Sequence, residues 1–224
     1  MTTSIPLHID FSTRESRIGV VRRLGYQTFC KKSRHPENFI SRTDGGEEYI
    51  DRRREKRYAG SKHRKGKDMT SVLFVCHGNI CRSPMAEFVF KDMVAKAGFA
   101  DRFFIASAAT STEEIGNPVH HGTRSKLAQY GISTAGKFAV QLTKKDYAKY
   151  DYLLGMDSWN MRNMRRMLGN DPDGKLHLLL DFSDEPRDIA DPWYTGNFDV
   201  TYNDIVEGCE AFLEYLKREG ILWD

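Results

Sequence analysis

The chain has 224 residues, of which 40% are hydrophobic, and it carries a formal net charge of +3. This length allows one or two domains with a globular core. No apolar run approaches the roughly 20 residues that span a bilayer, and the N-terminus lacks the pattern of a secretory signal. The four scattered cysteines do not form a disulfide scaffold. These features exclude a small secreted scaffold and predict a cytoplasmic protein without a membrane partner.

The charge is unevenly distributed along the chain. Residues 1–68 contain 17 Lys and Arg against 9 Asp and Glu, and the rest contains 17 against 22. Residues 1–68 also show little apolar periodicity and end in a basic run, so they predict a disordered N-terminal extension. A nucleic-acid or membrane-surface tail is the alternative for the basic run. Because Met69 directly precedes an apolar strand, the extension is also compatible with a misassigned start site.

From residue 69 onward, apolar patterns alternate between strand and helix. Strands are predicted at 72–75, 103–106, 151–154 and 176–180. Helices are predicted at 84–97 and 124–130, after Thr143, from Asp157 to 168, and after Asp199. This alternation predicts an α/β fold in which residues 69–224 form a single domain. Its core is a four-stranded parallel sheet flanked by helices on both faces, and no nucleic-acid partner is expected for it.

The first strand and the first helix of this domain are joined by a short polar loop. The strand ends at Cys76, and Ser83-Pro84 is a typical start for a helix. Backbone N–H groups and the positive end of the helix dipole then point into the loop, which predicts an anion site. Cys76 is a candidate nucleophile, and Arg82 has the planar fork that binds two phosphate oxygens. A buried structural cysteine in a Rossmann-like turn is the alternative.

Cleavage of a phosphate ester through a cysteine also needs a proton donor for the leaving oxygen. A carboxylic acid on a different loop would supply it, and Asp191 in Asp191-Pro192-Trp193 fits this role. The dipeptide Asp-Pro by itself is usually only a turn. Asp184 and Asp188 are the nearest competitors in the sequence.

The run CHGNICRSP at 76–84 resembles the phosphate-binding loop of the low-molecular-weight protein tyrosine phosphatases. The resemblance extends from about residue 69 to the C-terminus. It implies that the first strand is central in the sheet, and that the chain hydrolyses phosphotyrosine in proteins or small aryl phosphates. It further implies a cysteinyl-phosphate intermediate on Cys76, general acid and base catalysis by Asp191, release of inorganic phosphate, and no metal or other cofactor.

The same resemblance assigns the remaining site residues. Asn79 would fix the loop conformation, although a purely structural left-handed residue is equally compatible. Ser83 would cap the helix and donate to the Cys76 thiolate. Cys81 would form a protective disulfide with Cys76 or serve as a small buried side chain. The loop also contains His77, Gly78 and Ile80, and the substrate pocket is predicted to contain Glu113, Glu114, Trp193 and Tyr194.

Some features depart from the family or leave alternatives open. The segment reads Lys137-Phe138-Ala139-Val140 where the family often has basic residues such as histidine and arginine, so support for the loop from this segment does not carry over from the resemblance. Glu113 and Glu114 stand where vertebrate members of the family have an aromatic and a polar residue, so the substrate preference of those members does not carry over to this chain. His120 and His121 lack further metal-ligand spacing and are expected to be exposed loop residues. An arsenate reductase of the same fold is one alternative, but its chemistry needs two further relay cysteines. Beyond Cys76 and Cys81, residues 69–224 contain only Cys209, which argues against it. A protein-arginine phosphatase and a phosphate-binding module without turnover are further alternatives.

Overall fold

The computed structural model describes residues 19–23, 26–32, 38–43, 46–51 and 69–222. The chain divides into two compact units, Met1–Gly60 and Ser61–Asp224. Each unit is described separately below.

The first unit contains an antiparallel sheet in the order β1-β2-β3-β4. Its strands are β1 (Gly19–Arg23), β2 (Tyr26–Lys32), β3 (Asn38–Thr43) and β4 (Gly46–Asp51). These four strands lie within residues 1–68, and the assignment of that segment as a disordered extension stays a prediction. Thr43 pairs with Gly46, and the two residues between them in the sequence are Asp and Gly, a dipeptide typical of a tight hairpin. The basic run predicted to be disordered at 52–68 lies outside the described residues.

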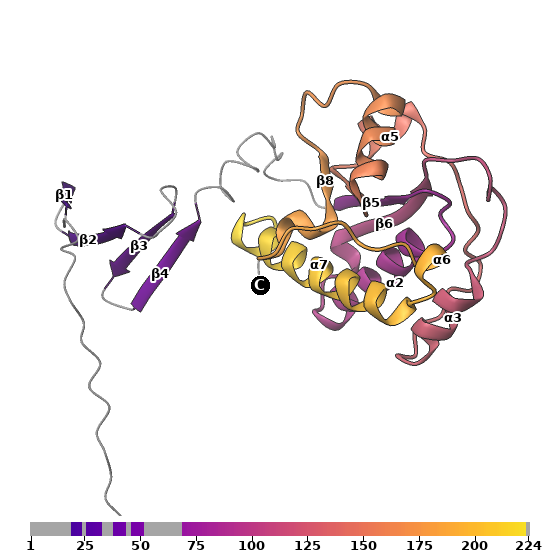
Figure 1. Ribbon diagram of the computed structural model, residues 1–224, viewed down its shortest axis with the longest axis horizontal. Helices are drawn as coiled ribbons and strands as arrows, with labels where there is room; N and C mark the ends of the chain where they lie inside the picture. The colour runs from indigo at the N-terminus through magenta and orange to yellow at the C-terminus, as the bar shows by residue number, and fades with distance from the viewer. Residues whose placement is uncertain (1–18, 24–25, 33–37, 44–45, 52–68, 223–224) are drawn as a thin grey trace, which may run out of the picture. The chain divides into compact units, whose positions relative to one another are not determined.

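The second unit contains the predicted parallel sheet, in the order β6-β5-β7-β8 (Figure 1). Its strands are β5 (Thr70–Cys76), β6 (Phe103–Ala109), β7 (Tyr152–Gly155) and β8 (Leu176–Leu178). All three strand pairings are parallel, which confirms the predicted α/β fold. Every residue of β5 is buried, as expected for a central strand covered on both faces. Because these pairings are parallel, the carboxyl end of β5, where Cys76 lies, is beside the carboxyl ends of β6 and β7.

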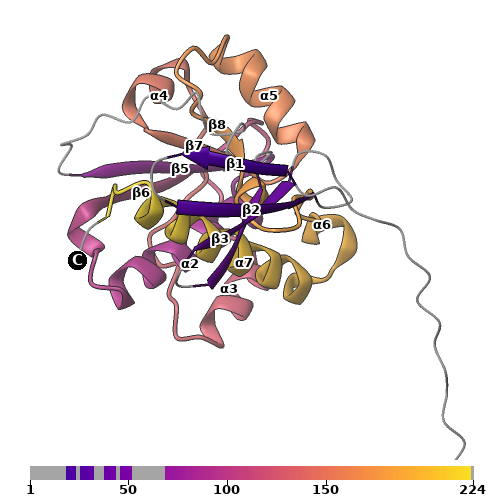
Figure 2. The same cartoon turned by 90° about the vertical axis from the view of Figure 1, so that its left-hand side faces the viewer.

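Helices cover both faces of this sheet (Figures 1 and 2). One face carries α2 (Arg82–Lys96) and the long C-terminal helix α7 (Phe198–Arg218), with α3 (His121–Ala128) beside them. The other face carries α4 (Lys144–Lys149) and α5 (Ser158–Leu168). The short elements η1 (Ala100–Arg102), η2 (Leu179–Phe182) and α6 (Pro192–Thr195) lie in the connections.

The core has two parts, one on each face of the sheet. Beneath α2 and α7, aromatic rings contact one another in a continuous cluster of Phe74, Phe90, Tyr152, Phe182 and Phe212. Beneath α5, aliphatic side chains of β5, β7 and β8 pack around Met164. Burial of this apolar area is the main force that holds the two helical layers on the sheet. None of the described helices has the length and apolar composition needed to cross a bilayer.

Several predicted boundaries differ from the structure. The predicted strand 176–180 ends at Leu178, because the apolar residues that follow turn into η2, where Leu179 and Leu180 are fully buried. An apolar run of this length does not distinguish a strand from a buried helical turn. Helix α7 begins at Phe198 and is capped by Asn197, whose side chain accepts from the N–H of Val200, so Asp199 is not the cap.

Candidate active site

The loop between β5 and α2 is held in a tight conformation around Cys76. Helix α2 begins at Arg82 with Cys81 in the N-cap position and no side-chain cap, so the prediction that Ser83 caps the helix is wrong. Asn79 has a φ of 57°, the one positive φ among the described residues other than glycine. Asparagine tolerates this left-handed conformation better than most residues. The turn brings the N–H of Asn79 to 3.3 Å from Cys76 Sγ.

The hydrogen bonds of Asn79 set the direction of donation toward Cys76. Asn79 Oδ1 accepts from the N–H of Val140 at 3.1 Å, so its Nδ2 faces Ser83 Oγ and donates to it at 2.8 Å. Ser83 Oγ lies 3.0 Å from Cys76 Sγ, closer than the 3.5 Å to the carbonyl of Ala108, so its hydroxyl is placed to donate to the sulfur. Cys76 Sγ thus has two hydrogen-bond partners at this loop, the N–H of Asn79 and the hydroxyl of Ser83.

The network continues from Asn79 to a buried ion pair on α2. Asn79 Nδ2 also donates to Ser107 Oγ at 2.8 Å, and Ser107 donates to Glu87 Oε2 at 2.6 Å. Lys137 Nζ lies 2.9 Å from the same carboxylate oxygen and donates to the carbonyl of Ser107 at 3.0 Å. Segment 137–140 therefore supports the loop through contacts of its own: the N–H of Val140 binds Asn79, and Lys137 binds Glu87 and Ser107 behind it.

Both terminal nitrogens of Arg82 are hydrogen-bonded, and the side chain lines the pocket described below. Nη1 donates to Asp157 Oδ2 and to the carbonyl of Ile189 at 3.1 Å. Nη2 donates to Asp191 Oδ2, and Nε has no hydrogen-bond partner among the described residues. The edge formed by Nε and Nη2 is the geometry that binds two oxygens of one phosphate. Burial alone lowers the pKa of Arg82, but the charges of Cys76, Asp191 and Asp157 outweigh it and raise this pKa.

The sequence places Asp157 at the start of a predicted helix and does not indicate its second role. Its Oδ1 accepts from the N–H of Asn160 at 2.6 Å and so caps α5, while Oδ2 pairs with Arg82. The only signal in the sequence was an acidic residue at the end of a predicted strand.

Asp191 faces the same guanidinium from the segment before α7. It caps the four-residue helix α6 by accepting from the N–H of Trp193 at 3.0 Å, and its Oδ2 pairs with Arg82 Nη2. Asp188, the competing carboxylate, is instead bound to the N–H and hydroxyl of Ser158, both at 2.9 Å. The geometry therefore favours Asp191 as the proton donor.

These residues enclose a pocket of about 110 Å³. At its mouth, His77 Nε2 lies 3.1 Å from Glu113 Oε2, and Glu114 accepts from Asn117 at 2.7 Å. A Cβ on Gly78 would lie 3.1 Å from the side chain of Glu114, so glycine permits this close approach. Asn79 and Ser83 lie behind the pocket, whereas every other predicted site residue lines it: Cys76, His77, Gly78, Ile80, Cys81, Arg82, Glu113, Glu114, Asp191, Trp193 and Tyr194.

The two other cysteines of this unit differ from Cys76. Burial, followed by the nearby charges of Cys76 and Asp191, raises the pKa of Cys81 to about 12. Cys209 is fully buried in α7, and burial raises its pKa as well. Both thiols are therefore protonated at neutral pH. Cys81 and Cys76 are both free thiols in the structure, and the disulfide between them stays a prediction.

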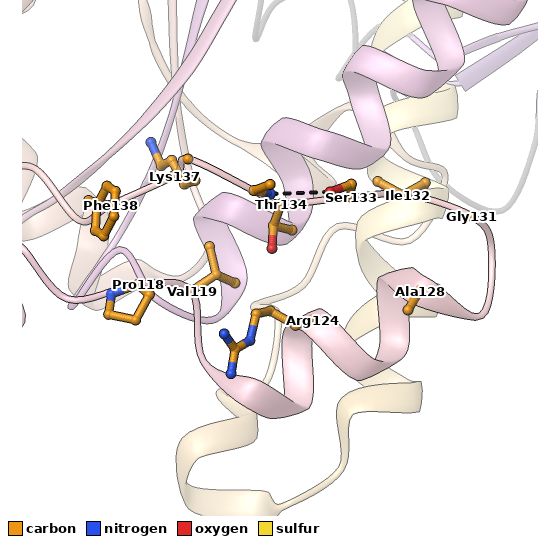
Figure 3. A pocket seen from close by; sticks show the side chains of 12 residues that line it. Pro118, Val119, Arg124, Ala128, Gly131, Ile132, Ser133, Thr134, Lys137 and Phe138 are labelled. Atoms are coloured by element: carbon orange, nitrogen blue, oxygen red, sulfur yellow. Dashed lines mark hydrogen bonds between the residues drawn. The ribbon is translucent and has the colours of Figure 1, made fainter.

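A larger cavity of about 570 Å³ lies between α3 and the segment that follows it (Figure 3). Its walls include Val119, Arg124 and Phe138, and no residue of the phosphate loop lines it. Lys137 also lines it, but its ammonium group is bound to Glu87 and Ser107. Among the described residues that line this cavity, Arg124 is then the one cation without such an ion pair. The smaller pocket, with its cysteine, arginine and carboxylates, is therefore the better candidate for chemistry.

The class that this geometry defines is that of phosphatases whose nucleophile is a cysteine. A sulfur that accepts hydrogen bonds at the end of a strand, an arginine edge beside it and a carboxylic acid opposite are what that chemistry requires.

The chain belongs to the family of low molecular weight phosphotyrosine protein phosphatases, which matches residues 71–221. It is 42% identical to the low molecular weight protein-tyrosine-phosphatase YfkJ of Bacillus subtilis, over 67% of this chain and 98% of that protein. It is also 42% identical to the low molecular weight phosphotyrosine protein phosphatase of Mus musculus, over 64% and 94%.

Solved structures give the same result. The crystal structure of YfkJ covers 70% of this chain and 99% of its own, with a TM-score of 0.66. A Drosophila arginine phosphatase is 32% identical, with a TM-score of 0.60, and covers 65% of this chain and 97% of its own.

Proposed function

We propose that this protein hydrolyses phosphotyrosine, in proteins or as small aryl phosphates, through a phosphocysteine intermediate on Cys76. Membership of the low molecular weight family makes the chain a phosphatase, and its curated relatives carry tyrosine phosphatase names. The observation that supports the mechanism best is the donation from Ser83 Oγ and the N–H of Asn79 to Cys76 Sγ. Both contacts stabilise the sulfur as a nucleophile and as a leaving group.

In the first step, the Cys76 thiolate attacks phosphorus and the bond to the phenolic oxygen breaks. The Nε and Nη2 edge of Arg82 and the N–H groups of the loop hold the phosphoryl oxygens. Asp191 gives its proton to the departing oxygen, so the alcohol leaves as a neutral phenol and Asp191 becomes a carboxylate.

In the second step, water attacks the phosphorus of phosphocysteine. Asp191 accepts a proton from the water, the sulfur–phosphorus bond breaks, and inorganic phosphate is released with the thiolate restored. Each residue ends as it began, and no cofactor or metal enters the balance. Ser83, which donates to the sulfur, favours its departure as a thiolate.

The walls of the pocket favour an aromatic leaving group over a guanidinium. Ile80 lines the pocket, and Trp193 and Tyr194 stand exposed at its mouth. An apolar wall leaves the N–H donors of a buried guanidinium unpaired, at about 1–3 kcal/mol each. Ile80 also packs with Cys81 and Ala139 beneath Phe198, so it has a structural role too. We expect kcat/KM to be higher for phosphotyrosine than for phosphoarginine, and Ile80→Thr to reduce this ratio. Preference of the wild type for phosphoarginine would reassign the substrate to that of the Drosophila relative.

An arsenate reductase is a weaker alternative. Beyond the pair in the loop, the part of this unit that the structure describes holds only Cys209, which is fully buried in α7. A buried helical thiol with a raised pKa is a poor relay for electrons.

Residues 69–224 are proposed as the catalytic domain of a cytoplasmic enzyme, and residues 1–68 as a separate extension. Two observations support this assignment. The chain divides into two units near Gly60, and residues 1–68 have an excess of positive charge whereas residues 69–224 have an excess of negative charge. Limited proteolysis should release a fragment that starts near Met69 and keeps full activity. An inactive or unfolded fragment would make the extension part of the catalytic fold.

The decisive experiment is hydrolysis of p-nitrophenyl phosphate, with and without EDTA, by the full chain and by Cys76→Ser. We expect EDTA to have no effect and the serine variant to lose turnover by at least about a thousandfold. Near-normal turnover in Cys76→Ser would refute the phosphocysteine mechanism, and loss of activity in EDTA would point to a metal.

A further inference from the structure

We propose that His120 is a positioning residue that holds the acid-bearing segment, Asp191 to Trp193, against the phosphate loop. The proposal rests on the general-acid role of Asp191 proposed above. His120 itself does not line the catalytic pocket, so it would act on the reaction through Asp191. The prediction that His120 is merely an exposed loop residue does not account for the contacts described next.

The backbone and ring of His120 are fixed relative to the phosphate loop. Its N–H donates to the carbonyl of Ile80 at 2.9 Å, and its Nδ1 accepts from the N–H of Gly122 at 3.1 Å, which caps α3. Burial, together with the nearby charges of His121 and Arg124, lowers the pKa of His120 against the opposing effect of Glu114. The imidazole is therefore neutral at pH 7, and Nδ1 keeps the lone pair that the cap requires.

The imidazole ring connects the loop to the segment that carries the acid. It stacks on Phe198 with 5.4 Å between centroids and 4° between planes, and it meets Trp193 edge-to-face at 5.7 Å and 70°. On the loop side, Phe198 packs against the cluster that contains Ile80. The packing is close, because a Cβ on Gly122 would lie 2.4 Å from the ring of Phe198.

Trp193 transmits this position to Asp191, because its N–H donates to Asp191 Oδ1 at 3.0 Å. Helix α6 has only four residues, so it has little internal structure to fix its own orientation. The carboxylate is held by Arg82 on one side and by the Trp193–His120 contact on the other. Loss of the ring would free one of these two sides, and a displacement of about 1 Å can cost about a hundredfold in rate.

The two functions of His120 can be separated by a matched pair of substitutions. His120→Asn keeps a capping acceptor for α3 but removes the ring, whereas His120→Phe keeps a ring but removes the acceptor. The assay is kcat/KM for a series of aryl phosphates, from p-nitrophenyl phosphate to phenyl phosphate, because a poor leaving group depends most on the proton donor. We expect His120→Asn to lose about 10–100-fold for phenyl phosphate and less than about threefold for p-nitrophenyl phosphate. His120→Phe should lose thermal stability and keep the leaving-group profile of the wild type.

Asp191→Asn, alone and combined with His120→Asn, distinguishes this proposal from the one it rests on. We expect Asp191→Asn to show a steep leaving-group dependence, and the added His120→Asn to cause no further loss, because His120 acts through Asp191. If Asp191→Asn shows no such dependence, the general-acid assignment fails. If it does but His120→Asn loses equally for all leaving groups or only lowers the Tm, then His120 is structural and the proposal is overturned. The same follows if the losses of the two variants add.

Discussion

The ion pair between Lys137 and Glu87 gives the sharpest test of the network behind the nucleophile. Glu87 is buried on α2, with only 5% of its side chain exposed, and Lys137 is 12% exposed. The substitution Lys137→Met keeps most of the apolar stem and removes the charge. Glu87 then keeps Ser107 and the more exposed Lys91, at 42%, as partners.

The expected cost follows from leaving a buried carboxylate partly unpaired. Removal of one partner of a buried pair typically destabilises a protein by about 3–5 kcal/mol. Because Lys91 and Ser107 remain, we expect the lower end of this range, about 3 kcal/mol at pH 7. The matched control is Lys91→Met, which removes an exposed partner of the same carboxylate and should cost less than about 1 kcal/mol.

The pH dependence of this cost has a definite sign. Burial alone raises the pKa of Glu87, but Lys137 and the hydrogen bonds from Lys91 and Ser107 outweigh it, so the pKa is lowered from 4.5. Its contribution to stability is therefore present above pH 4.5 and is lost as the pH falls through the lowered value. In Lys137→Met burial dominates and the pKa of Glu87 rises, so protonation now relieves the cost. The difference between variant and wild type should then shrink as the pH falls from 7 toward 4.5.

Urea unfolding at pH 7 and pH 4.5 measures this difference for both variants and the wild type. Because the other titrating groups are common to all three proteins, the change in the difference reports on Glu87. A cost of Lys137→Met that matches that of Lys91→Met, or that grows in acid, would refute the reasoning. The same variant should also lower kcat/KM, since Ser107 and Asn79 connect Glu87 to Ser83.

Two further predictions concern the pocket. Iodoacetamide at pH 7 should label Cys76 but spare Cys81 and Cys209, whose raised pKa values keep them as thiols; peptide mapping that finds Cys81 labelled as fast as Cys76 would contradict this. Asp157→Asn keeps the cap of α5 but weakens the anchor of Arg82, so the inhibition constant of inorganic phosphate should rise about tenfold. An unchanged constant with normal stability would mean that Ile189 alone fixes Arg82.

The phosphate loop could be predicted from the sequence because its signals lie in one stretch. The apolar strand, the loop and the helix start follow one another from residue 72 to 84. Asp191 lies beside Arg82, as expected for an acid in that connection, and its role as proton donor stays a prediction. Local rules also set the limits of this approach. Ser83 is a typical capping residue, yet its hydroxyl contacts Asn79 and Cys76, and the helix begins at Arg82, two residues earlier than predicted.

The support behind the loop could not be predicted, because its members come from separate elements. Glu87 and Lys91 are four apart on α2 and have the pattern of an ordinary surface pair. Only the fold brings Ser107 of β6 and Lys137 of the later segment to the same carboxylate. Comparison with the family therefore gave no reason to expect support for the loop from Lys137. In the structure its ammonium group contacts Glu87.

Arg82 connects the phosphate clamp to the acid. Its Nη1 is fixed by Asp157 and the carbonyl of Ile189, so the guanidinium plane is set before any phosphate arrives. A phosphoryl group bound by Nε and Nη2 must compete with Asp191 for Nη2, because Asp191 Oδ2 uses that nitrogen. The two negative charges also repel each other, which favours movement of the Asp191 carboxylate away from Arg82. In the proposed mechanism, the ion pair with Arg82 therefore helps to keep Asp191 beside the pocket until a phosphoryl group is bound.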